Sequence, residues 1–116
     1  MSHRSRRRFE SLVSDALDEL PGWVQEAMDN VAVVVEDQPP DDDSDLLGLY
    51  EGIAQTEREF YAGALPDRIT LFRSTIEAEA GRDDEQLRAL IAETVVHEVA
   101  HHFGISDDRL EALGWD

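Results

Sequence analysis

Apolar residues recur at the spacing of an α-helix in the first part of the chain. Over residues 9–20 they lie three or four positions apart, so they share one face of a helix. Pro21 and Gly22 interrupt this pattern, and a second short helix is predicted over residues 23–28, or as far as Asn30. The apolar face of the first predicted helix consists of Phe9, Leu12, Val13, Ala16, Leu17 and Leu20.

Three later segments have the composition of β-strands. Residues 31–35 read Val-Ala-Val-Val-Val, which is typical of a strand buried on both faces. Residues 46–51 are predicted as a second strand, and Gly48 and Gly52 indicate an edge that another backbone can approach. Residues 68–73 alternate in the manner of a third strand. The second strand is equally compatible with an edge that binds an extended peptide and with an ordinary edge blunted by glycine and charge.

A long helix is predicted over residues 83–103. Gly81 ends the segment before it, and Asp83 with Gln86 resembles a capping box. One stripe of this helix consists of Leu87, Leu90, Ile91 and Thr94, and it continues through His97, Glu98 and His101, which predicts that these last three face inward. The rest of the circumference carries Val95, Val96, Val99, Ala100 and Phe103 near the end, as expected for a helix buried on several sides.

The order of these elements predicts an α+β fold, with a small three- to four-stranded mixed sheet flanked by helices. A chain of 116 residues with 41% hydrophobic residues is suited to a single compact domain. We expect this domain to span residues 9–116. Residues 1–8 contain four of the ten arginines, and we expect them to form a basic, disordered arm.

The composition narrows the possible partners. The formal net charge is −17, so most of the surface should repel nucleic acid, although the basic arm could still contact RNA or an acidic protein. There is no apolar run of membrane-spanning length and no continuous apolar signal region, so we expect a cytoplasmic protein without a membrane partner. The chain has no cysteine, which excludes disulfides and thiolate metal ligands.

The sequence His97-Glu98-Val99-Ala100-His101 is an HExxH motif. Residues four apart lie on one face of a helix, so both imidazoles can bind one Zn²⁺ ion at roughly 2.0 to 2.1 Å. Glu98 lies one position along, where its carboxylate can take a proton from zinc-bound water and pass it to a leaving amine. His102 points about 100° away from His101, which favours a packing or hydrogen-bonding role.

A third metal ligand is expected close to the motif, because only residues 102–116 follow it. Asp107 is the best candidate, since Gly104 can end the helix in a left-handed conformation and turn the chain back toward the ion. Asp108 is a close rival. Glu111 and Asp116 are more remote candidates. The predicted metal ligands are therefore His97, His101 and Asp107, with Glu98 as the catalytic residue.

With these motifs, the chain resembles the small bacterial zincin-like metallopeptidases known as minimal zincins. The resemblance covers most of the chain after the arginine-rich start, and it implies a small sheet flanked by helices with an active-site helix behind it. It also implies that His97 and His101 bind zinc and that Glu98 is the general base. The segments that carry the resemblance are Leu47-Gly48-Leu49-Tyr50-Glu51-Gly52, Pro66-Asp67-Arg68-Ile69, and the run from Thr94 to Gly104.

The motif also resembles the metzincin pattern HExxHxxGxxH, with Asp107 in place of the last histidine, as in snapalysin-like peptidases. A carboxylate ligand should leave zinc a weaker Lewis acid than a third imidazole would. No methionine follows the motif, so the Met-turn of metzincins is absent and the cleft is expected to be shallow and open. A partner or a homodimer could supply the missing wall. By residue type alone, Tyr50, Tyr61 and Arg109 are candidate donors to an oxyanion.

Three functions are compatible with these features. The leading hypothesis is a zinc-dependent peptidase that acts on a peptide or protein substrate. The alternative is a non-catalytic, zinc-stabilised module that binds another protein. A metal-dependent nuclease is a third possibility, but an acidic domain lacks the basic groove that a phosphate backbone requires.

Overall fold

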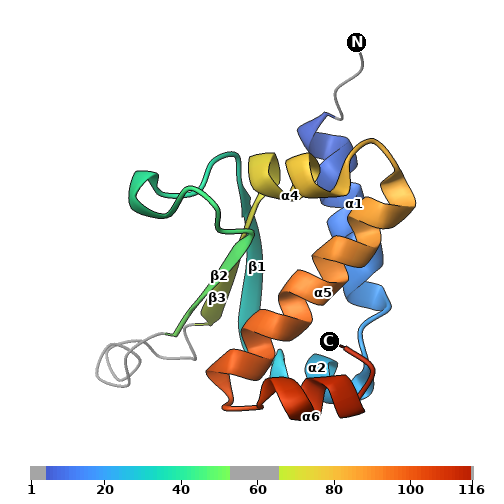
Figure 1. The fold of residues 1–116 in the computed structure, drawn as a ribbon, viewed down its shortest axis with the longest axis vertical. Helices are drawn as coiled ribbons and strands as arrows, with labels where there is room; N and C mark the ends of the chain where they lie inside the picture. Colours follow the sequence, from blue (N-terminus) through green and yellow to red (C-terminus); the bar gives the residue numbers. More distant parts are fainter. Residues whose placement is uncertain (1–4, 53–65, 116) are drawn as a thin grey trace.

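The computed structural model describes residues 5–52 and 66–115. A three-stranded sheet forms one side of the molecule, and helices cover it from the other side (Figure 1). The elements in chain order are α1 (Arg6–Asp18), α2 (Gly22–Ala27), β1 (Val31–Glu36), the 3₁₀ turn η1 (Asp41–Asp43), β2 (Gly48–Glu51), β3 (Asp67–Phe72), α4 (Arg73–Ala80), α5 (Asp84–His102) and α6 (Asp107–Ala112). The predicted α+β class with a small mixed sheet is confirmed.

The strand order in the sheet is β1-β3-β2. β1 pairs with β3 in parallel, from Val31 opposite Asp67 to Glu36 opposite Phe72, whereas β2 pairs with β3 in antiparallel fashion. β3 is the central strand, so the residues of its second half are buried on both faces. The prediction that residues 31–35 are buried on both faces is wrong, because β1 is an edge strand and residues 31–34 are only half-buried.

Helix α1 begins earlier than the apolar pattern predicts. Ser5 is its N-cap, and the Ser5 side chain accepts a hydrogen bond from the backbone N–H of Arg8 at 3.0 Å. The guanidinium group of Arg8 lies 2.8 Å from the Asp84 carboxylate at the start of α5. Residues 6–8 therefore form the first turn of a helix, where the sequence led us to expect the end of a disordered arm, because capping and ion pairs stabilise this turn. Residues 1–4 of the predicted arm lie outside the described residues.

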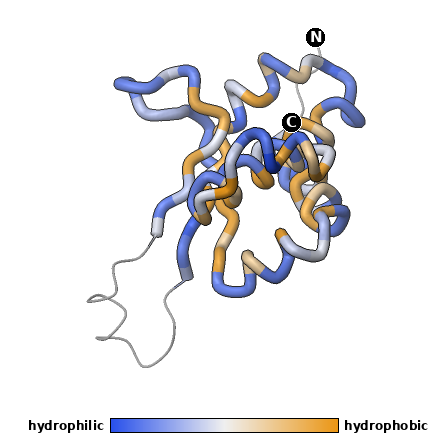
Figure 2. The backbone as a smooth tube through the Cα atoms, turned by 60° about the horizontal axis from the view of Figure 1, so that its bottom comes forward, coloured by the Kyte–Doolittle hydropathy of each residue, from blue (hydrophilic) through white to orange (hydrophobic). Residues whose placement is uncertain are grey.

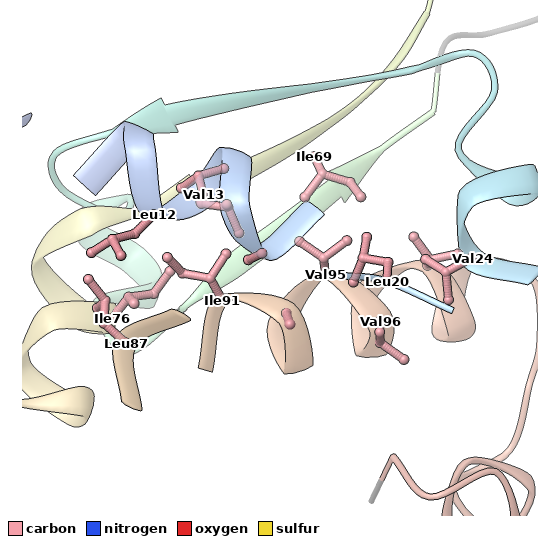
Figure 3. Close-up of a cluster of buried hydrophobic side chains, with 14 of the residues drawn as sticks. Leu12, Val13, Leu20, Val24, Ile69, Ile76, Leu87, Ile91, Val95 and Val96 are labelled. Carbon is pink, nitrogen blue, oxygen red and sulfur yellow. The ribbon is translucent and has the colours of Figure 1, made fainter. Parts of the chain in front are cut away.

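Helix α5 matches its prediction closely. The carboxylate of Asp83 accepts a hydrogen bond from the backbone N–H of Glu85 at 2.8 Å and so caps the helix. Side chains on several sides of α5 are buried, and they pack against residues of α1, α2, β3 and α4 (Figure 3). The buried residues of α5 are Leu87, Ile91, Ala92, Thr94, Val95, Val96, Val99 and Ala100. This burial anchors the helix on which the HExxH motif lies.

Helix α4 was not predicted from the sequence. It directly follows β3 and buries only Ile76 and Ala80, which is too few apolar positions to show a helical period. Gly81 ends it at a φ of 77°, as expected from the break at this glycine.

The connection between β1 and β2, residues 37–47, projects from the sheet and is largely hydrophilic, whereas hydrophobic positions gather in the interior (Figure 2). In the described part of the chain, none of the helices combines the length and the apolar character needed to cross a lipid bilayer.

Candidate active site

The HExxH residues lie in the last turns of α5, where the helix emerges from the core. His97 and Glu98 are half-buried, whereas the His101 side chain is 58% exposed. The imidazole rings of His97 and His101 have centroids 6.0 Å apart and an interplanar angle of 81°. The predicted inward face therefore reaches the surface at His101.

A tight turn after α5 brings Asp107 to His101. The backbone N–H of Ile105 donates to the carbonyl of Ala100 at 2.8 Å, that of Gly104 donates to the carbonyl of His101 at 3.2 Å, and Gly104 has a φ of 75°. These bonds form a Schellman motif, which requires a left-handed residue at this position. Asp107 then opens α6, and its Oδ1 lies 3.5 Å from the Nε2 atom of His101.

The donor set can be tested against the geometry of a zinc site. Two ligands that each lie about 2.05 Å from a tetrahedral ion are roughly 3.3 Å from each other. The separation of 3.5 Å between His101 and Asp107 is close to this value. The chemistry of the donors, two imidazoles and a carboxylate, also suits zinc. His101 and Asp107 are therefore spaced as two ligands of one ion would be, and the chemistry of all three donors suits zinc.

The remaining donor, His97, faces a backbone atom and not His101 and Asp107. The Nε2 atom of His97 lies 3.0 Å from the backbone carbonyl oxygen of Trp115. Within residues 5–52 and 66–115, no three histidine or acidic side chains converge on one point as a metal cluster. Metal binding at this site would require His97 to exchange the Trp115 carbonyl for the ion. Asp108, the rival third ligand, is exposed.

Glu98 lies beside the edge strand β2. Its carboxylate accepts a hydrogen bond from the backbone N–H of Tyr50. Burial raises the pKa of the Glu98 carboxyl group above its ordinary value, while the Tyr50 hydrogen bond and the nearby His101 and His97 oppose this rise. A half-buried carboxylate with one backbone donor and two imidazoles beside it is suited to accept and release protons.

At this site, every second residue from Gly48 in β2 to Gly52 just after it lies beside every fourth residue of α5. A Cβ atom on Gly48 would lie 2.9 Å from Cγ2 of Thr94, and one on Gly52 would lie 3.4 Å from Cε1 of His102. The Tyr50 contact with Glu98 falls between these two. Two strand residues advance about 6.8 Å and four helix residues about 6.0 Å, so the repeats nearly match. Gly48 is required because only a glycine lets the helix approach the strand this closely.

Among residues 5–52 and 66–115, β2 pairs with β3 alone, and its other edge faces this site. The backbone N–H of Phe72 donates to the carbonyl of Leu47 at 2.9 Å, and Leu49 lies opposite Thr70. In an antiparallel pair, every second residue of a strand bonds its neighbour. Leu47 and Leu49 bond β3, so the backbone groups of the alternate residues, Gly48 and Tyr50, point away from β3. The edge predicted from the glycines is therefore present, and the Tyr50 amide on this edge binds Glu98.

The remaining polar candidates have other contacts. The His102 ring stacks on Tyr50 with centroids 3.9 Å apart, which agrees with the packing role expected for this histidine. The hydroxyl of Tyr50 donates to the Asp67 carboxylate at 2.7 Å, which makes it a poor oxyanion donor. Arg109 is exposed on α6, and Tyr61 lies outside the described residues.

A cleft with a volume of about 400 Å³ opens next to His97 and Glu98. Its walls come from the segment before β2, the end of α4 and one face of α5. The lining residues are Asp43, Asp45, Leu46, Leu47, Gly48, Glu79, Leu90, Glu93, Thr94, His97 and Glu98. Sequence reasoning missed Glu79 and the two aspartates. Leu90 and Thr94 belong to the stripe that was predicted to continue into the motif, and Glu93 could have been found because it lies one turn before His97 on the same face.

A family model described as zincin-like metallopeptidase matches residues 28–115 of the chain. The chain belongs to this zincin-like family. The match includes the sheet, the HExxH helix and α6, and it leaves α1 outside. The family assignment agrees with the resemblance drawn from the motifs.

Among solved structures, the zincin-like chain is similar to a conserved hypothetical protein from Thermus thermophilus. The two share 24% sequence identity with a TM-score of 0.56, and the match covers 97% of this chain and 100% of the other. At this identity, the similarity supports the fold alone. No curated protein matches the chain significantly.

Proposed function

We propose that this zincin-like protein is a zinc-dependent peptidase that hydrolyses peptide bonds in a peptide or protein substrate. Glu98 accepts a hydrogen bond from the backbone of the edge strand β2 and lies next to His97 in the lining of a cleft of about 400 Å³. A candidate general base, candidate metal ligands and a strand edge therefore lie in one region of the molecule.

His97, His101 and Asp107 would hold the metal. Zinc, when bound, supplies a Lewis acid that polarises the scissile carbonyl and makes a water molecule more acidic. The carboxylate of Glu98 takes a proton from the attacking water and delivers it to the leaving amine. The outward backbone groups of Gly48 hydrogen-bond an extended substrate beside β2, which positions the scissile bond near Glu98.

A specific observation also favours the alternative of a non-catalytic zincin-like module that binds a protein partner. The His97 ring is engaged by the Trp115 carbonyl, and the Asp107 side chain is 87% exposed. An exposed ligand in water holds zinc less rigidly, and an open site excludes water poorly. In this alternative, zinc stabilises the fold and the edge of β2 binds the partner.

Metal content is the first test of the proposal. Elemental mass spectrometry of the untagged, zinc-reconstituted protein should find about one zinc per chain. The ion should be lost in His101→Ala and retained in Glu98→Gln. Asp107→Ala and Asp108→Ala are compared side by side, and loss of zinc in only the first identifies the third ligand. Absence of zinc from the reconstituted wild-type protein would contradict both candidate functions.

Peptide cleavage then separates the two functions. The zinc-loaded protein is incubated with a mixed peptide library, and new termini are identified by mass spectrometry. Cleavage should fall by about 10²- to 10⁴-fold in Glu98→Gln. The matched control is Glu26→Gln, because Glu26 is exposed on α2 outside the cleft. Undiminished cleavage in Glu98→Gln refutes the role of the base, whereas zinc binding without any cleavage supports the binding module.

A further inference from the structure

We infer that the cleft beside Glu98 selects polypeptides that present a lysine or arginine side chain to it. This inference rests on the proposed function, because it names the substrate class of the same site. It is drawn from the charges, the apolar surface and the strand edge that meet in the cleft, and four of the five acidic residues there lie outside the HExxH motif.

The charges in the cleft all have one sign. Five of its lining residues are acidic, none is lysine or arginine, and they come from three separate segments of the chain. The ion pairs that arginines form in the described part of the chain involve acidic residues outside this cleft. Those paired carboxylates belong to Glu10, Glu19, Asp37, Glu51, Glu77, Asp84 and Glu85. The acidic residues of the cleft are Asp43, Asp45, Glu79, Glu93 and Glu98.

The acidic composition of the whole chain does not by itself explain this arrangement. Acidic residues make up 27 of 116 positions in the chain, but five of the eleven residues that line the cleft. The concave shape of the cleft focuses the field of these like charges into the space where a substrate side chain would enter. A glutamate or aspartate of a substrate would be repelled from the same space.

The cleft also matches the apolar part of a long basic side chain. Leu46, Leu47 and Leu90 line it and are half-buried, so each leaves apolar surface exposed. Lysine and arginine place their methylene stems along apolar surface and keep the charged group at its polar margin. Here, the margin is provided by Glu79 and Glu93, both of which are exposed.

The strand edge supplies a way for such a side chain to reach the cleft. Gly48 belongs both to the lining of the cleft and to the outward backbone of β2. A peptide that pairs with this edge directs alternate side chains to one face of the extended sheet. One of these side chains therefore enters the acidic cleft, while the backbone passes beside Glu98.

The test measures binding separately from cleavage. Fluorescence anisotropy is recorded for three labelled peptides of one sequence, in which a single position is arginine, glutamine or glutamate. The protein is Glu98→Gln, which cannot complete the proposed reaction. We expect the arginine peptide to bind most tightly and the glutamate peptide most weakly, with a difference that shrinks at high salt.

Neutralising substitutions then locate the effect. The double variant Glu79→Gln/Glu93→Gln removes two negative charges from the cleft. Each exposed ion pair with the arginine of the peptide that is lost should weaken binding of this peptide by a few-fold, and loss of both should weaken it by about fivefold. The control, Asp15→Asn with Glu26→Gln, removes two exposed charges outside the cleft and should leave binding of the arginine peptide unchanged. Circular dichroism melts establish that both double variants are folded.

The possible outcomes have distinct meanings. Equal weakening by the cleft and control substitutions would show that only net charge matters and would overturn the inference, as would equal binding of all three peptides. Binding of the arginine peptide in the cleft, without cleavage by the protein that retains Glu98, supports the basic preference and refutes the peptidase. Cleavage with no preference for basic residues supports the peptidase and refutes the inferred preference.

Discussion

Substitution of Gly48 by alanine tests the close approach of β2 to α5. A Cβ atom at this position would lie 2.9 Å from Cγ2 of Thr94 and 3.3 Å from the carbonyl oxygen of Thr70. Thr94 cannot easily move, because it is buried and its hydroxyl donates to the carbonyl of Leu90 at 2.7 Å. We expect the strand and helix to be forced apart.

The magnitude follows from two opposing effects. Overpacking of this kind typically destabilises a protein by about 1–3 kcal/mol. The φ angle of Gly48 is not positive, so alanine can adopt it and reduces the entropy of the unfolded chain, which returns about 0.4–1 kcal/mol. The free energy of unfolding should therefore decrease by about 1–2 kcal/mol.

A double-mutant cycle in urea, with unfolding followed by circular dichroism, measures the coupling between positions 48 and 94. Thr94→Ser removes the Cγ2 methyl group and keeps the hydroxyl, so Gly48→Ala should destabilise that background less, with a coupling energy of about 1 kcal/mol, and only the tight contact with the Thr70 carbonyl oxygen persists. Gly22→Ala is the control, because a Cβ atom there meets nothing within 4 Å. If Gly48→Ala has the same effect with serine as with threonine at position 94, the clash with Thr94 is not its cause.

Three further predictions concern the turn after α5, His97 and the net charge. Gly104→Ala places a side chain at a φ of 75° and should lower the free energy of unfolding by about 1–2 kcal/mol in urea, with a smaller decrease for Gly104→Asn; equal effects of the two would argue against left-handed strain. Zinc binding should change the fluorescence of Trp115 in a Trp23→Phe background, because His97 must release the Trp115 carbonyl; zinc uptake at full stoichiometry with no spectral change would contradict this exchange. The melting temperature should rise as salt screens the net charge of −17, and a melting temperature independent of salt between low and physiological ionic strength would show that repulsion contributes little to stability.

Features that depend on neighbours along the chain could be predicted from the sequence. The bounds of α5 follow from the cap at Asp83 and from the helical period of its apolar residues, both of which are local signals. The turn at Gly104 was expected for the same reason, and it delivers Asp107 to His101 as the spacing indicated. The HExxH residues lie on the predicted helix, which brings the His97 and His101 rings to 6.0 Å between centroids, but His97 faces the Trp115 carbonyl and not a shared ion position.

Features that depend on the order of the sheet or on backbone atoms could not be predicted in this way. The burial of β1 was overestimated because nothing local shows that β3 is inserted between β1 and β2. The acidic cleft joins Asp43, Glu79 and Glu93, which lie far apart in the sequence. The partner of His97 is a backbone carbonyl, and a pattern of residue types carries no information about such an atom.

Residues of β2 contact α5 at regular intervals, from Gly48 beside Thr94 to Gly52 beside His102. This spacing determines where the domain can gain or lose residues. A single inserted or deleted residue within Gly48–Gly52 would exchange the two faces of the strand, so that the Tyr50 amide would turn from Glu98 toward β3 and a side chain would replace the glycine against Thr94. Residues 38–42 precede the residues that line the cleft with α5, and they can lengthen or shorten without shifting the register of β2. We therefore expect related domains to vary in size before β2 and to preserve the spacing between Gly48 and Gly52.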